Sequence, residues 1–120
     1  MEVTVKHNIP DERIQDLLCS AFADSSNYWI KKIEYIYPRG KSREDFTYSH
    51  IELPLHGGSI IVTNVDGEER TLDRNSIERG LKLMAEEYPK DMSDFLNEND
   101  DAYTADLFLQ LCLFREEVYS

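Results

Sequence analysis

The residue types most suited to ligand chemistry gather in one short region, residues 27–43. Basic side chains there alternate with large aromatic ones, a combination with which proteins hold nucleotides and single strands. The residues that would bind a nucleotide in this way are Asn27, Tyr28, Trp29, Lys31, Lys32, Arg39, Lys41 and Arg43. The alternative is an amphipathic strand whose aromatic residues face the core and whose lysines face solvent. We favour this alternative, because alternation alone explains both features.

A second candidate surface is acidic and lies in the second half of the chain. The protein has 24 acidic and 13 basic side chains, a formal net charge of −11. Residues 1–60 carry a net charge of −2, and residues 61–120 carry a net charge of −9. A field of this sign repels phosphate backbones and attracts basic surfaces, although acidity can also serve solubility alone. The carboxylates that we expect to contact a basic partner are Glu86, Glu87, Asp91, Asp94, Glu98, Asp100 and Asp101.

Two further patterns resemble binding motifs but lack the spacing that such motifs require. The segment Arg39-Gly40-Lys41-Ser42 is similar to the end of a phosphate-binding loop, but Tyr35 stands where the first glycine of that loop is needed. His50, Glu52 and His56 have even spacing and would share one face of a strand. A proline and two glycines interrupt that strand, so we expect a solvated face and no metal site.

The cysteines and serines give no indication of an enzyme. Cys19 and Cys112 each lie in a helical apolar pattern, and neither has a basic neighbour that would activate a thiol. No serine lies in a nucleophile-elbow pattern. Two cysteines in a chain of this size indicate a reduced, cytoplasmic protein, and the chain has neither an apolar signal core nor an apolar run of membrane-spanning length. We therefore expect a binding protein without cofactor or membrane contact.

The hydrophobic pattern predicts the elements that position these residues. We expect a short strand at Val3–Val5, a helix from Pro10 to the turn at Asp24–Asn27, strands near 28–37, 48–55, 59–65 and 69–72, and helices over 74–88, around 92–96 and over 102–114. Asp66-Gly67 predicts a hairpin between the last two strands. The final helix is apolar nearly all round, which indicates a buried helix or a subunit contact.

This order predicts one domain over residues 1–120 in the α+β class. An antiparallel sheet of about four to five strands would pack with one N-terminal helix and two to three C-terminal helices.

Five segments of the chain resemble a family of small uncharacterised accessory proteins from bacteriophage and prophage genomes. They are SNYWI, GGSIIV, TLDRNSIERGLKLMAEEYP, DFLNENDDAYTADLFLQLCLF and EEVY, and the resemblance extends from about Leu17 to Tyr119. Members of that family often have glycine near Asp24-Ser25 and at the positions of Arg115 and Ser120, where this chain departs from the pattern. The resemblance implies a phage-borne accessory gene and brings no catalytic residues with it.

The charge, the resemblance, the aromatic and basic stretch and the apolar last helix lead to three hypotheses of different classes. The first is a counter-defence inhibitor of the anti-CRISPR type, a nucleic-acid mimic that binds a basic surface on a host nuclease or CRISPR effector and does not itself bind nucleic acid. The second is a homo-oligomer that binds or sequesters a nucleotide through residues 27–43. The third is a structural or assembly factor without a ligand, which would associate through its C-terminal helix.

Overall fold

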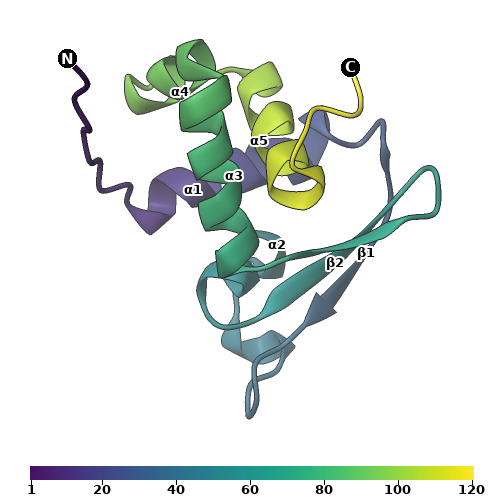
Figure 1. Ribbon diagram of the computed structural model, residues 1–120. Coiled ribbons are helices and arrows are strands. Elements are labelled where there is room, and N and C mark those ends of the chain that lie inside the picture. The colour runs from purple at the N-terminus through teal and green to yellow at the C-terminus, as the bar shows by residue number, and fades with distance from the viewer.

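The computed structural model describes residues 1–120 as one α+β unit with a helical layer on one face of a small sheet (Figure 1). The regular elements in chain order are α1 (Asp11–Ser20), β1 (Ile30–Ile36), α2 (Ser49–Glu52), β2 (Ser59–Asn64), β3 (Glu69–Leu72), α3 (Arg74–Glu87), α4 (Pro89–Leu96) and α5 (Ala102–Phe114). A π-helical turn, Ala21–Ser25, extends α1, and 3₁₀ turns cover Arg43–Asp45 and Leu53–Leu55. The α+β class is therefore confirmed.

The sheet has three antiparallel strands in the order β1-β2-β3. Ile33 of β1 pairs with Val62 of β2, and Tyr35 pairs with Ile60, so these side chains share the face that the helices cover. Lys32 and Glu34 are exposed on the opposite face. The interpretation of this stretch as an amphipathic strand is therefore confirmed, and so is the hairpin between β2 and β3.

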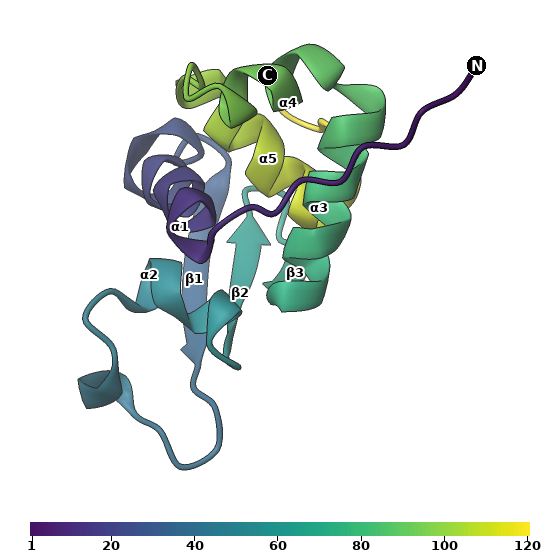
Figure 2. The same ribbon diagram turned by 90° about the vertical axis from the view of Figure 1, so that its left-hand side faces the viewer.

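Two expected strands do not form, which leaves three strands where four to five were predicted. Residues 1–8 are extended, exposed and unpaired, because no strand of the sheet lies beside them (Figure 2). The segment 48–55 is helical instead of extended. The Glu52 carboxylate accepts the Tyr48 backbone N–H at 2.6 Å. Pro54, whose fixed φ suits the first turn of a helix, is the second residue of the Leu53–Leu55 turn.

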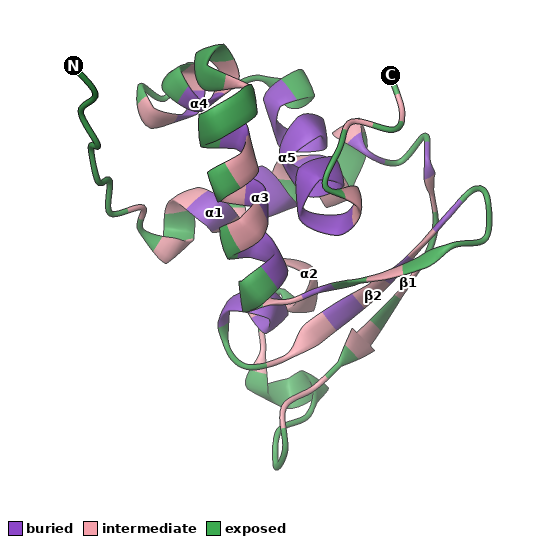
Figure 3. Cartoon of the chain, viewed as in Figure 1, coloured by how far each residue is buried: buried purple, intermediate pink, exposed green.

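Helix α5 is the centre of the core, and its bounds are those that the sequence predicts. Ten of its 13 residues are buried, and it packs against α1, α3 and the π-helical turn (Figure 3). Gly80 allows α3 to approach closely, because a Cβ there would lie 2.9 Å from the backbone nitrogen of Cys112. Most of α5 is therefore buried within a single copy of the chain, and little of its apolar surface is left to contact a second copy.

The end of α5 carries backbone strain at a position where glycine is expected. Arg115 follows the helix with φ of 63°, in the left-handed region, while its N–H donates to the Leu111 carbonyl at 3.1 Å. An L-residue with a side chain pays roughly 1 kcal/mol or more for this conformation, whereas glycine adopts it freely. Arg115 is exposed and forms no ion pair that would offset the strain.

Replacing Arg115 with glycine should therefore stabilise the protein. We expect Arg115→Gly to raise the free energy of unfolding by about 0.5–1 kcal/mol, since relief of strain exceeds the added entropy of the unfolded chain. Urea unfolding, followed by circular dichroism, measures this change. Lys82→Gly, at an exposed position inside α3, is the matched control and should lower stability by about 1 kcal/mol. A variant Arg115→Gly that is no more stable than wild type would contradict the expectation.

Candidate functional site

The aromatic stretch before β1 is anchored to a buried carboxylate in α5. Asp106, only 6% exposed, accepts four hydrogen bonds. One oxygen accepts the hydroxyl of Ser26 and the indole N–H of Trp29, both at 2.7 Å. The other accepts the hydroxyl of Tyr28 at 2.6 Å and the amide of Gln110 at 3.2 Å. The lone pairs of this carboxylate are thereby satisfied within the protein, as a buried charged group requires.

Gln110 extends the network from Asp106 to the C-terminal tail, residues 115–120. Its side-chain oxygen accepts the backbone N–H groups of Val118 and Tyr119, both at 2.8 Å. Its amide nitrogen also donates to the Tyr119 carbonyl at 3.0 Å. These contacts hold the tail alongside α5 and fix which end of the Gln110 amide faces Asp106.

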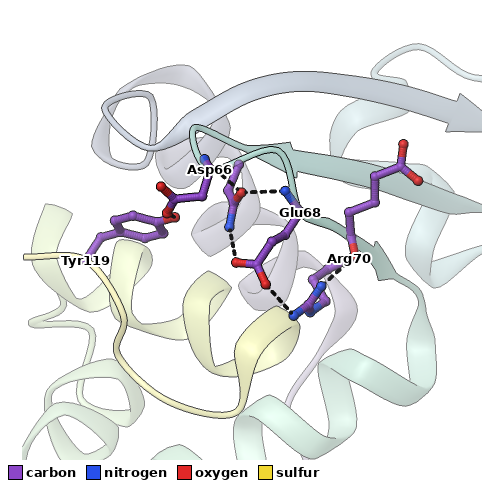
Figure 4. A network of polar contacts seen from close by, with 6 residues as sticks. Asp66, Glu68, Arg70 and Tyr119 are labelled. Carbon is purple, nitrogen blue, oxygen red and sulfur yellow. Dashed lines mark hydrogen bonds and ion pairs between the residues drawn. The ribbon is translucent and has the colours of Figure 1, made fainter.

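Tyr119 joins the tail to the strand hairpin. Its ring stacks on Trp29, with centroids 5.5 Å apart and planes 3° from parallel. Its hydroxyl donates to Asp66 in the hairpin turn at 2.6 Å, and beside it Glu68 pairs with Arg70 at 3.3 Å (Figure 4). The bond to Asp66 and burial raise the pKa of Tyr119 to about 12. For Tyr28, burial and the bond to Asp106 likewise raise the pKa to about 12.

These contacts give the aromatic residues structural roles, and the eight residues predicted to bind a nucleotide do not form one site. Trp29 is fully buried beneath Tyr119, so no base can stack on it. The Asn27 side chain donates to the Ala23 carbonyl at 3.2 Å, while Lys31 and Lys32 are exposed on β1.

The remaining three predicted residues, Arg39, Lys41 and Arg43, lie in the loop between β1 and α2. Arg39 and Lys41 line a pocket there with a volume of about 370 Å³.

The seven predicted partner-binding carboxylates lie on adjoining segments at the end of the helical layer formed by α3, α4 and the loop before α5 (Figure 1). Three of them already have partners within the chain. Asp94 pairs with Lys90 at 3.3 Å, and Asp100 pairs with Arg13 at 3.1 Å. Asp101 caps α5 by accepting the Thr104 N–H at 3.0 Å, and its hydrogen bonds to Thr104 lower its pKa.

The other four carboxylates, those of Glu86, Glu87, Asp91 and Glu98, form no ion pair with the chain. Glu87 and Asp91 lie close to Tyr88. Two further acids from the tail, Glu116 and Glu117, join them, although they are not among the carboxylates predicted from the sequence. Burial, followed by the charges of Glu117, Glu87, Asp91 and Glu116, raises the pKa of Tyr88.

Tyr103, at the start of α5, lies beside the same group. Burial and the adjacent Glu117 carboxylate raise the pKa of Tyr103 to about 12. Its side chain is nevertheless 46% exposed, which leaves part of the ring available to a partner. We name this surface the tyrosine–acid cluster, and it consists of Glu87, Tyr88, Asp91, Tyr103, Glu116 and Glu117.

The other candidate chemistries do not assemble into sites. No group of three or more His, Cys, Asp or Glu residues is arranged to hold a metal ion. His50 packs its ring edge-on against Phe22, with centroids 6.4 Å apart, and the Glu52 carboxylate caps a helical turn. Cys112 is buried, which raises the pKa of its thiol and keeps it unreactive, while Cys19 is an exposed free thiol.

Comparison with protein-family models, curated proteins and solved structures finds no match. None of the helices combines the length and the apolar character that crossing a membrane requires.

Replacing Asp106 with asparagine should destabilise the protein although the side chains have the same shape. The new amide N–H₂ would face either Gln110 or the pair Ser26 and Trp29, and Gln110 cannot turn because two backbone N–H groups hold its oxygen. A donor facing a donor in a buried site costs about 2–3 kcal/mol.

Urea unfolding of Asp106→Asn, followed by fluorescence of Trp29, the only tryptophan, measures this loss. Asp24→Asn, an exposed change of the same chemistry, should leave stability within about 0.5 kcal/mol of wild type. Equal stability of the Asp106 variant and the wild type would show that the network is not needed.

Proposed function

We propose that the protein binds a basic surface on another protein through its tyrosine–acid cluster. The supporting observation is that, in addition to burial, four carboxylates without ion pairs raise the pKa of Tyr88, and two of them, Asp91 and Glu117, also raise that of Tyr103. Like charges held together repel one another, so a cationic partner surface would stabilise them. Glu86 and Glu98, which also lack ion pairs, would extend the contact along the same end of the helical layer.

The tyrosines add a contact that charge alone would not supply. Tyrosine is enriched among the residues that dominate binding energy, because it contributes a large rigid ring and a polar hydroxyl. A guanidinium group can stack on such a ring while it pairs with the neighbouring carboxylate. The cluster therefore favours partners whose basic surface is rich in arginine.

The partner class that fits this chemistry is a protein with a nucleic-acid channel. An acidic surface competes with phosphates for such a channel and accelerates association by electrostatic steering. The resemblance to phage accessory proteins leads us to propose a nuclease or a CRISPR effector of the host cytoplasm, which the protein would inhibit. On this proposal the protein acts as a counter-defence factor and not as an enzyme.

The proposal is tested with two variants of equal charge. The cluster variant neutralises the four acids of the cluster as Glu87→Gln, Asp91→Asn, Glu116→Gln and Glu117→Gln. The control neutralises four exposed acids without ion pairs elsewhere, as Glu2→Gln, Glu12→Gln, Asp24→Asn and Glu34→Gln. Tagged wild-type protein first captures its partner from bacterial lysate, and the purified partner is then titrated with each form.

We expect the cluster variant to bind at least about tenfold more weakly, a loss of 1.4 kcal/mol, and to show a flatter dependence of affinity on salt. The control should bind within about twofold of wild type, because it removes the same net charge from other surfaces. Equal weakening of both variants would mean that net charge acts without a defined surface. Unchanged binding by the cluster variant would refute the proposed site.

A further inference from the structure

A positively charged pocket lies at the loop between β1 and α2. This loop extends from the sheet at the end of the molecule away from α4 (Figures 1 and 2). The pocket has a volume of about 370 Å³, within the range of small-molecule sites. Its lining residues are Pro38, Arg39, Lys41, Asp45, Phe46 and His56. Three of these six side chains are cationic or can become so.

Hydrogen-bonded turns form the walls of this pocket. The Lys41 N–H donates to the Pro38 carbonyl at 3.0 Å, and Gly40 supplies the positive φ of 79° at the third position of this turn. Opposite lies the turn at Gly57, whose φ is 88° and where a Cβ would lie 3.7 Å from that of Pro38. Arg39 lies in the first turn and His56 directly precedes Gly57, and both line the pocket.

The charge around the pocket is opposite to that of the whole protein. The loop between β1 and α2, residues 37–48, contains three basic and two acidic side chains, a net charge of +1 in a protein of net charge −11. Arg39 and Lys41 form no ion pair, although the chain has 24 carboxylates. The carboxylate that lines the pocket, Asp45, accepts the Ser42 backbone N–H at 2.8 Å and so stabilises the adjoining turn.

An aromatic wall completes the pocket. Phe46 is half-buried and packs against Tyr37, with ring centroids 5.8 Å apart. The Tyr37 hydroxyl is in turn 3.1 Å from the hydroxyl of Ser49, which fixes Tyr37 behind Phe46. Phe46 thus offers a supported ring on which a planar group could stack, at the side of the basic groups.

We infer that this pocket binds a nucleoside monophosphate. The phosphate pairs with Arg39 and Lys41 and reaches the imidazole of His56, while the base stacks on Phe46. This site differs from the nucleotide site expected from the sequence, because Trp29 is buried and takes no part. It is also independent of the tyrosine–acid cluster in residues, in charge and in the kind of ligand.

The test uses adenosine monophosphate, inorganic phosphate and adenosine as probes of the full chain. Calorimetry measures affinity, and backbone amide NMR locates the site. We expect the monophosphate to bind more tightly than phosphate, and adenosine to bind most weakly. The amide shifts should be confined to residues 38–46 and 56–58. Shifts that centre elsewhere, or a wild-type protein that binds neither phosphate nor the monophosphate, would overturn the inference.

Variants then separate the two halves of the ligand. Arg39→Gln with Lys41→Gln should weaken both the monophosphate and phosphate by about tenfold or more. Lys31→Gln with Lys32→Gln removes the same charge from outside the pocket and should change affinity by less than about twofold. Phe46→Leu should weaken the monophosphate by about fivefold and leave phosphate binding unchanged. If the pocket variant, Arg39→Gln with Lys41→Gln, and the control, Lys31→Gln with Lys32→Gln, lost the same affinity for the monophosphate, a defined site would be refuted.

Discussion

The four hydrogen bonds that converge on the Asp106 carboxylate are the constraint on which the rest of the structure depends. A buried charge is tolerated only when its lone pairs are satisfied. Three of the donors come from the turn that precedes β1, and the fourth is Gln110. The side-chain oxygen of Gln110 accepts two backbone N–H groups of the tail, and its amide nitrogen donates to a backbone carbonyl there. Satisfying one carboxylate therefore fixes three parts of the chain: the turn before the sheet, the central helix and the C-terminal tail.

The fold separates two regions of opposite charge that the net charge of −11 conceals. The molecule extends 49 Å along its longest axis, several times the screening length of about 8 Å at physiological ionic strength. Figure 1 places α4 and the loop between β1 and α2 at opposite ends. Solvent ions therefore screen the basic pocket from much of the field of the acidic end. On the two proposals, one small chain would present a surface for cations and a pocket for an anion.

Local patterns predict the parts of this fold that depend on neighbours in sequence. The Asp66-Gly67 turn and the limits of α5 follow from such patterns. The Asp106 network does not, because its donors Ser26, Tyr28 and Trp29 lie 77 to 80 residues earlier in the chain. The available signal was a carboxylate and an amide four residues apart within an otherwise apolar helix. The segment 48–55 is helical where the sequence predicts a strand, because alternating apolar residues suit a strand and tight helical turns alike.

The C-terminal tail shows why composition alone does not predict which acids form the tyrosine–acid cluster. Glu116 and Glu117 follow α5 in sequence, yet they join Glu87 and Asp91, which lie 25 to 30 residues earlier. They do so because Gln110 and the stack of Tyr119 on Trp29 turn the tail back along α5. The carboxylates of the cluster repel one another, and the hydrogen bonds of the tail hold them together against that repulsion. On the proposed function, a cationic partner would relieve this repulsion, and the contacts that order the tail would also prepare the cluster for binding.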